Sequence, residues 1–362
     1  MALREPPLRE VHAERGAQFT DFGGWDMPVE FDSIRTEHTA VRESVGKFDV
    51  SHMGEVTLSG PDAQRLLNRL TTNDVSALDD GEAQYAAITD QEGIILDDTV
   101  VYNLPAAASA DYLFIPNAGH DEEMYERWVT HRDEWGLEAT VENCTTDYAM
   151  IAVQGEGAAS VLRAATDIDL ADLSRFDIAA GTVAGVDSFV ARTGYTGEPG
   201  FEVLCPWDDA ESVWSALDCQ PCGLGARDTL RIEMGFLLSG QDFDPEDNPR
   251  TPYEAGIEFV VKLDAEFVGR DALEGIAVEG HEEELVGLTL VDRGVPRHGY
   301  DVTTPDGDPL GTVTSGTMSP TLGDPIAMAY LPVEYAEPDR TVRVVIRGEP
   351  KKARTTTTPF LS

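Results

Sequence analysis

The spacing of apolar residues shifts along the chain between the helical period of about 3.6 residues and the two-residue period of strands, which predicts a mixed α+β fold. One helix is expected over residues 33–45. Another is expected after Gly60, Pro61 and Asp62, because these residue types favour the start of a helix. The buried side of that second helix would carry Leu66, Leu67 and Leu70.

Two sequence segments within the first 270 residues resemble each other and indicate an internal repeat. The segments that begin at Gly60 and Gly155 share a glycine, an alanine three positions on, a leucine seven positions on and an exit rich in Thr and Asp. Each is followed by two strand-like runs around a glycine turn, over residues 85–102 and 188–206. We therefore expect two related lobes, each a helix packed on antiparallel strands.

The pattern changes from about Glu282 to short alternating strands separated by Gly, Pro and Asp. Such spacing is typical of a small antiparallel barrel or sandwich, and we expect a C-terminal β-barrel. The acidic stretch EGHEEE, residues 279–284, would be the linker that precedes it. The expected lobes are residues 1–50 with 145–270 and residues 51–144, which together make one functional region over 1–270, followed by the barrel over 282–362.

Residues 93–102, GIILDDTVVY, are predicted to form a strand that carries two adjacent carboxylates. Because side chains in a strand alternate between faces, Asp97 and Asp98 must point in opposite directions. Asp98 would share its face with Ile94, Leu96, Val100 and Tyr102, where an ionised carboxylate loses hydration that a partner must replace. Asp98 is therefore either a structural aspartate held by backbone N–H groups or an arginine, or a group with a chemical role.

The charge composition of the chain argues against nucleic-acid binding and indicates the salt conditions in which the protein works. The 362 residues contain 26 Lys and Arg against 67 Asp and Glu, a formal net charge of −41, which argues against a nucleic-acid-binding surface. The acids are spread along the chain and only four basic residues are lysines. This pattern is typical of proteins that work in multimolar salt, where charge repulsion is screened over about 3 Å or less. An acidic protein from a low-salt organism is the alternative.

The sequence also indicates where the protein is located and which catalytic motifs it lacks. No apolar run approaches the ~20 residues that a membrane span needs, and the N-terminus has no signal-peptide pattern, so a cytoplasmic protein is expected. Walker A, GxGxxG, GxSxG and HExxH motifs are missing, and His52 is expected to be structural.

The cysteines are Cys144, Cys205, Cys219 and Cys222. The last two form a lone CQPC without the second pair that a structural zinc site needs. Reduced thiols and no metal site are expected, with a redox role as the alternative.

The stretch RTGYTGEPGFEV, residues 192–203, is a candidate binding loop. Its three glycines and one proline surround Tyr195 and lead into Glu202. Glycines let the backbone approach a ligand closely, and a tyrosine beside a carboxylate suits a flat, hydrogen-bonding heterocycle. The alternative is an ordinary hairpin in which Glu202 is solvated.

The stretch GLGARDTLRIEMGF places Arg227 and Arg231 four residues apart on a predicted helix. An arginine in this position can hold a carboxylate in a bidentate manner. Both arginines could equally pair with Asp228 and Glu233 on a solvated face, so the local pattern leaves the choice open.

Seven motifs, taken in order, resemble the aminomethyltransferase family of the glycine cleavage system, the T-proteins. The motifs are DFGGWDMPVEF, FDVSHMGEVTLSGPDA, GIILDD, RTGYTGEPGFEV, GLGARDTLRIEMG, TPYEAGI and VTSGTMSPTL, and the resemblance runs from Pro7 to Phe360. It implies a three-lobed enzyme that takes the aminomethyl group from the lipoyl arm of H-protein. The one-carbon unit would pass to the co-substrate tetrahydrofolate as 5,10-methylenetetrahydrofolate, with release of ammonia. The P- and L-proteins would be further partners.

The resemblance also implies roles for individual residues. The family's catalytic aspartate, the second acid of its pair, falls on Asp98, which the strand pattern also singles out. The pterin-binding residues fall on Tyr195 and Glu202, and the folate-contacting arginine on Arg227. Tyr85 and Met53 would line the same cavity. Asp98 would orient folate N10 and accept its proton, with a pKa raised by burial.

The sequence departs from the family pattern in places, and other functions stay open. Only Gly93 precedes the aspartate strand, where two glycines are usual, and LSGQDF at 238–243 replaces a commoner sequence. A folate-binding regulatory protein without transfer activity is one alternative, although it would not need Asp98. A folate-dependent demethylase subunit acting on sarcosine or dimethylglycine is another, and it would require a separate dehydrogenase.

Overall fold

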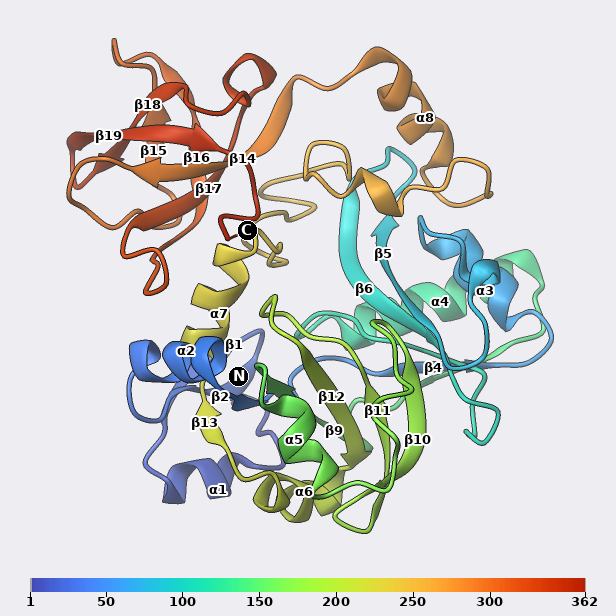
Figure 1. Ribbon diagram of the computed structural model, residues 1–362. Helices are drawn as coiled ribbons and strands as arrows, with labels where there is room; N and C mark the ends of the chain where they lie inside the picture. Colours follow the sequence, from blue (N-terminus) through green and yellow to red (C-terminus); the bar gives the residue numbers. More distant parts are fainter. Residues whose placement is uncertain (1, 362) are drawn as a thin grey trace. The chain divides into compact units, whose positions relative to one another are not determined.

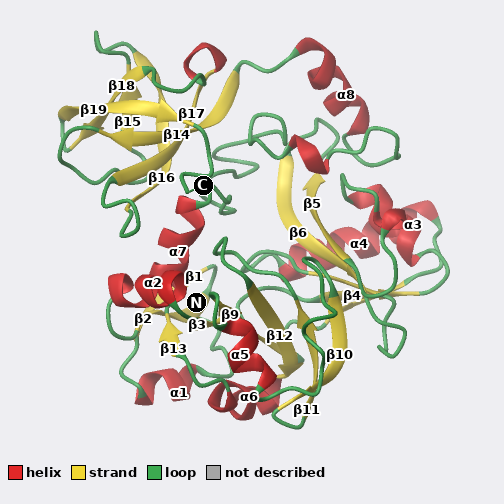
Figure 2. Cartoon of the chain, viewed as in Figure 1, coloured by secondary structure: helices red, strands yellow, loops and turns green. Residues whose placement is uncertain are grey.

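The computed structural model describes residues 2–361, which divide into two compact units (Figure 1). The first unit contains residues 2–88, 97–227 and 265–267, and the second contains residues 89–96, 228–264 and 268–361. Both expected classes of element are present in a mixed α+β chain (Figure 2), so the predicted fold class is confirmed. The predicted lobe boundaries stay a prediction.

A six-stranded sheet forms one part of the first unit, in the order β10-β11-β12-β9-β3-β13. The central strand β9 contributes Ala149, Ile151 and Val153 to a core that also contains Leu162 of α5 and Trp214 of α6. Alternation of apolar side chains along β9 therefore turns one face of the sheet toward these helices. The strands are β3 (Gly46–Asp49), β9 (Tyr148–Gln154), β10 (Ile178–Val183), β11 (Val186–Ala191), β12 (Gly200–Pro206) and β13 (Gln220–Cys222).

A five-stranded sheet forms the other part, in the order β5-β6-β7-β4-β8. The predicted helix after Asp62 is present as α3 (Ala63–Leu70), and its three leucines are buried as expected. Helix α3 contacts α4 (Asp121–Trp135), which packs on β8. The strands are β4 (Val56–Ser59), β5 (Ala83–Thr89), β6 (Ile95–Asn103), β7 (Tyr112–Phe114) and β8 (Thr140–Asn143).

The remaining elements of the first unit are short. Strands β1 (Gln18–Phe22) and β2 (Trp25–Glu30) form a hairpin, and the predicted helix over residues 33–45 is present as α2 (Ile34–Glu43). The other helices are α1 (Arg9–Glu14), α5 (Ala158–Arg163) and α6 (Ala210–Ala216), while α7 (Leu224–Glu233) continues into the second unit. Among residues 2–361, no helix combines the length and the apolar character needed to cross a membrane.

The second unit contains the expected C-terminal barrel. Six strands close it in the order β14-β17-β16-β15-β18-β19, and alternate residues such as Leu288, Val302 and Val344 fill its interior. The strands are β14 (Glu283–Leu290), β15 (Asp301–Thr303), β16 (Pro309–Met318), β17 (Pro325–Pro332), β18 (Thr341–Ile346) and β19 (Glu349–Thr356), and α8 (Arg270–Glu279) precedes them. Closure removes the free edges of the sheet, which an open sandwich would have left.

Strand β6 confirms the predicted alternation of side chains between its two faces. Its fully buried face carries Asp97, which has no exposed surface, whereas Asp98 lies on the half-buried face. Asp98 shares its face with Leu96, Val100 and Tyr102 as expected, and that face is partly buried, although the opposite face is buried more completely. Both faces of β6 are largely apolar, so the sequence pattern does not tell which of them the rest of the unit covers.

Candidate active site

The Asp98 carboxylate is held by hydrogen bonds from two neighbouring segments. The hydroxyl of Tyr85 on β5 donates to Oδ2 at 2.5 Å, and the side-chain amide of Asn117 donates to Oδ1 at 2.6 Å. Strand β5 lies directly beside β6 in the sheet, which positions Tyr85 for this contact. The structure thus brings together two of the predicted residues, Tyr85 and Asp98.

Asn117 reaches Asp98 because of the register between β6 and β7. Val101 pairs with Phe114 and Tyr102 with Leu113, so the same antiparallel register places Asn117 opposite Asp98. Sequence reasoning missed Asn117. The available signal was a polar residue just past a short apolar strand, but its value depends on knowing which strand pairs with β6.

Asp97, the residue before Asp98, contacts both Asn117 and His120. Asn117 donates its backbone N–H to Asp97 Oδ2 at 3.0 Å and its side-chain amide to Oδ1 at 2.7 Å. His120, the residue before α4, places Nδ1 3.3 Å from Asp97 Oδ2. That distance describes an ion pair more than a well-aligned hydrogen bond. His120 was also missed by sequence reasoning.

This environment changes the proton affinities of the cluster. Loss of hydration, and then the charge of Asp97, raises the pKa of Asp98 to about 6, although the hydrogen bonds from Tyr85 and Asn117 act to lower it. The contact with Asp97 raises the pKa of His120 to about 9. At neutral pH, Asp98 is therefore an ionised carboxylate that is unusually ready to accept a proton.

Glu202 lies on β12 with 8% of its surface exposed. Its Oε2 accepts a hydrogen bond from the Thr193 hydroxyl at 2.5 Å, and desolvation raises its pKa while Thr193 and Arg227 act to lower it. The alternative of a solvated Glu202 is therefore wrong. One bond from Thr193 leaves further lone pairs on this buried carboxylate for N–H donors of a ligand.

Strand β6 also connects to Glu202 through side chains. The hydroxyl of Tyr102, four residues after Asp98 on the same face of β6, lies 3.5 Å from Thr193 Oγ1. Thr193 in turn donates to Glu202. The two strands that carry the predicted acids, β6 and β12, therefore approach each other at Tyr102.

Arg227 at the start of α7 stacks on Tyr195, with its guanidinium carbon 4.3 Å from the ring centroid. A guanidinium above an aromatic face is a stabilising cation–π arrangement, and it offers a flat, positively charged surface. The charge of Arg227 acts on both Glu202 and His52, so each of these groups lies within electrostatic range of Arg227.

His52 and Met53 lie just before β4. Met53 is half-buried, whereas His52 is fully buried, with its ring edge-on to Phe22 at 5.1 Å. Burial, followed by the charge of Arg227, lowers the pKa of His52 to about 3, so its ring is neutral. A packed, neutral ring agrees with the predicted structural role, and the predicted contact of Met53 with a ligand stays a prediction.

Arg231 has different partners and a different degree of burial from Arg227. Its guanidinium is fully buried and pairs with Asp242 at 2.6 Å and Asp228 at 2.8 Å. It also donates to Ser315 Oγ of β16 at 2.7 Å. Arg231 therefore anchors the end of α7 within the second unit. The expected pairing with Asp228 is present, but the second acid is Asp242 instead of Glu233, and the pair with Asp242 is buried instead of solvated.

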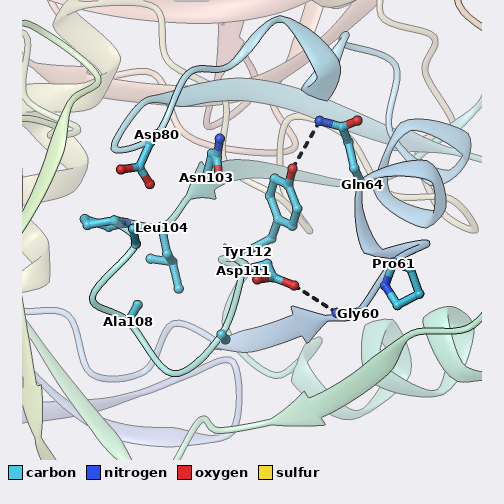
Figure 3. Close-up of a pocket in the computed structure, with 12 residues that line it drawn as sticks. Gly60, Pro61, Gln64, Asp80, Asn103, Leu104, Ala108, Asp111 and Tyr112 are labelled. Atoms are coloured by element: carbon cyan, nitrogen blue, oxygen red, sulfur yellow. Dashed lines mark hydrogen bonds between the residues drawn. The ribbon is translucent and has the colours of Figure 1, made fainter.

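A hollow of about 400 Å³ lies at the other end of the β6–β7 pair (Figure 3). Asn103 and Tyr112 line it together with Gln64, whose amide donates to the Tyr112 hydroxyl at 3.1 Å. None of the six predicted site residues lines this hollow. At about 3.3 Å per strand residue, Asn103 is roughly 16 Å along β6 from Asp98, so the hollow is a separate feature.

Metal chemistry finds no support in the described part of the chain. Within residues 2–361, no group of three or more His, Cys, Asp or Glu side chains is arranged to hold a metal ion. The four cysteines are free thiols, and burial raises the pKa of Cys205 to about 12 and that of Cys219 to about 11. Such thiols are poor nucleophiles and poor redox groups.

Family models match nearly the whole chain. The GCVT N-terminal domain matches residues 8–265, and the glycine cleavage T-protein C-terminal barrel domain matches residues 284–361. A solved structure, the glycine cleavage system aminomethyltransferase T from Bartonella henselae, is similar with a TM-score of 0.91 at 30% identity. The similarity covers 99% of this chain and 98% of that one.

Two curated relatives extend this result. A probable aminomethyltransferase from Haloarcula marismortui is 71% identical over 361 residues, covering 100% of this chain and 99% of the relative. One from Natronomonas pharaonis is 62% identical over 360 residues, covering 99% of each. These haloarchaeal sources agree with the expected adaptation to salt, and neither alternative function is favoured. The chain belongs to the glycine cleavage T-protein family.

Proposed function

We propose that this chain transfers the one-carbon unit of an aminomethyl group, carried on the lipoyl arm of H-protein, to tetrahydrofolate. The products are 5,10-methylenetetrahydrofolate and ammonia. Family membership and the names of the relatives support this enzyme class. The P- and L-proteins are the other partners we propose, and a cytoplasmic location stays a prediction. The observation that carries the proposal is the Asp98 carboxylate between Tyr85 and Asn117.

The reaction requires a positioned base. The transferred carbon loses its bonds to the lipoyl sulfur and to the amine nitrogen, and it gains bonds to folate N5 and N10. The two protons that leave N5 and N10 balance the free thiol and the ammonia that are formed. Asp98 would accept the proton from N10, and a carboxylate with a pKa of about 6 is ionised at neutral pH yet more basic than an ordinary aspartate.

Several residues fit a reduced pterin. The buried Glu202 carboxylate can accept paired N–H donors from the 2-amino group and N3 of the pterin ring. Tyr195, with Arg227 stacked on it, offers a flat surface against which a heterocycle can lie. Tyr85 would line the ring on the Asp98 side, and Met53 would complete the cavity.

The test compares Asp98→Asn with the matched control Asp80→Asn, a change at an exposed position away from the cluster. Ammonia release is measured with lipoylated H-protein, glycine, tetrahydrofolate and the P- and L-proteins in about 2 M salt, which screens repulsion between acidic partners. Tetrahydrofolate affinity is measured separately by titration.

Asp98→Asn should bind tetrahydrofolate nearly as well as the wild type and lose about 10²–10⁴-fold in turnover, the usual contribution of a general base. Asp80→Asn should behave as the wild type in both assays. Turnover within a few fold of the wild type in Asp98→Asn would refute the catalytic role of Asp98.

A further inference from the structure

A histidine that sequence reasoning missed lies beside Asp97, the first of the two acids of β6. His120 places Nδ1 3.3 Å from Asp97 Oδ2, and 30% of its side chain is exposed, whereas Asp97 has no exposed side-chain surface. We propose that His120 is a positioning residue that acts through Asp97 to keep Asp98 ionised and oriented for the transfer reaction. The inference rests on the proposed role of Asp98 as the base.

Asn117 links the two carboxylates physically. Its side-chain nitrogen lies 2.7 Å from Asp97 Oδ1 and 2.6 Å from Asp98 Oδ1, so these two oxygens are at most about 5 Å apart. Two carboxylates this close repel each other. The repulsion disfavours the ionised form most strongly for the carboxylate that has the weaker set of hydrogen-bond partners. Without a nearby cation, one of them would tend to hold a proton.

His120 supplies that cation. It is the residue before α4, and its backbone N–H donates to the Asn117 carbonyl at 3.0 Å, so the same short loop positions both residues against Asp97. Charges on Asp97, Glu123 and Asp98 all favour its protonated form. The imidazolium therefore offsets the charge of Asp97 and lowers the cost of ionising Asp98 beside it.

The other groups around Asp98 cannot substitute for His120. Tyr85 donates a hydrogen bond to Asp98 but is itself neutral, because burial and the nearby acids raise its pKa well above the ordinary value. Tyr195, which acts electrostatically on Tyr85, cannot carry a positive charge, because a phenol is either neutral or anionic. His120 differs from these groups because it can carry a positive charge, and the charges of Asp97 and Asp98 both act on it.

The direct test is the titration of the Asp98 carboxyl by NMR in protein labelled with ¹³C at aspartate Cγ. The Asp98 signal is identified by its absence in Asp98→Asn. His120→Gln removes the charge and should move the Asp98 midpoint upward by about one pH unit. His120→Lys keeps a cation and should leave the midpoint near that of the wild type. Asp97→Asn removes the repelling charge and should move it downward.

Kinetics provide a second readout. In His120→Gln, kcat/KM for ammonia release should fall about fivefold at pH 6 and stay within about twofold of the wild type at pH 8.5, because Asp98 ionises in both proteins at high pH. His120→Lys should restore the wild-type profile. A purely structural role would lower the rate equally at both pH values.

The inference fails if the Asp98 midpoint is unchanged in His120→Gln, or if it rises equally in His120→Gln and His120→Lys. The proposed function fails separately, if Asp98→Asn retains turnover. In that case, a shifted Asp98 midpoint in His120→Gln would still support the electrostatic link between the two residues. Should His120→Gln fold poorly, the same titration is made with His120→Asn, which also removes the charge of the imidazolium.

Discussion

Asn117 lies opposite Asp98 across the β6–β7 pair and donates its side-chain amide to the Asp98 carboxylate at 2.6 Å. The same amide nitrogen lies 2.7 Å from Asp97 Oδ1. One side chain therefore fixes the orientation of two carboxylates that point to opposite faces of a strand. This arrangement makes the geometry at Asp98 depend on the register of two antiparallel strands.

Asn117→Ala should lower turnover at pH 6.5 by about 10- to 100-fold, the usual cost of losing a hydrogen bond to a charged group. The Asn117 bond lowers the pKa of Asp98, so its loss should raise that pKa and make the defect smaller at pH 8.5. The measurement is ammonia release at both pH values. Gln64→Ala, at an exposed position of the separate hollow, is the control. Equal defects at both pH values would contradict this prediction.

Glu202→Gln should weaken tetrahydrofolate binding by about 10- to 100-fold, because an amide presents only one acceptor oxygen to paired N–H donors. Turnover at saturating tetrahydrofolate should change much less, since the proposed contact of Glu202 is with the pterin ring and not with the reacting carbon. Fluorescence titration and saturation kinetics measure the two effects. Thr193→Val, which removes the hydrogen bond to Glu202 Oε2, should give a smaller loss of affinity in the same direction. Unchanged affinity in Glu202→Gln would rule out its contact with the pterin.

Arg227 and Arg231 should respond oppositely to the same substitution. Arg231→Met leaves Asp242 fully buried without its guanidinium and should lower the free energy of unfolding by about 3–5 kcal/mol. Arg227→Met should cost about 1 kcal/mol or less, since Arg227 is only half-buried and its contact with Tyr195 is a cation–π stack, but it should weaken tetrahydrofolate binding about 10-fold. Guanidinium chloride unfolding and ligand titration separate the two. Equal loss of stability in both variants would show that this division of roles is wrong.

His120 should make stability depend on pH in a defined direction. Its pKa is raised in the folded protein from about 6.5 to about 9, so the protonated form stabilises the fold fully below pH 6.5. That contribution should be lost as the pH rises from about 6.5 to 9. The difference in unfolding free energy between the wild type and His120→Gln should therefore shrink across this range in guanidinium chloride titrations. A constant difference would mean that folding does not raise the pKa of His120.

The local and periodic features of this protein are predictable from its sequence. The composition of residues 93–102 predicts the strand β6. The two-residue period of a strand then predicts that Asp97 and Asp98 point in opposite directions, because neighbouring side chains along a strand alternate between faces. The leucines of α3 and the short alternating strands of the barrel were predictable for the same reason. The family motifs placed Asp98 and Tyr85 at one site, and the two side chains are hydrogen-bonded.

Which face of β6 is buried more completely depends on the tertiary structure, and it is the face of Asp97, while Asp98 is partly buried. The tertiary structure also decided that Asn117 and His120 stand beside these acids, because their positions follow from strand register and from a loop about 20 residues away in sequence. Arg231 became a buried anchor through contacts with the strands that follow. Burial and partner choice depend on segments distant in the chain, so no local pattern contains them.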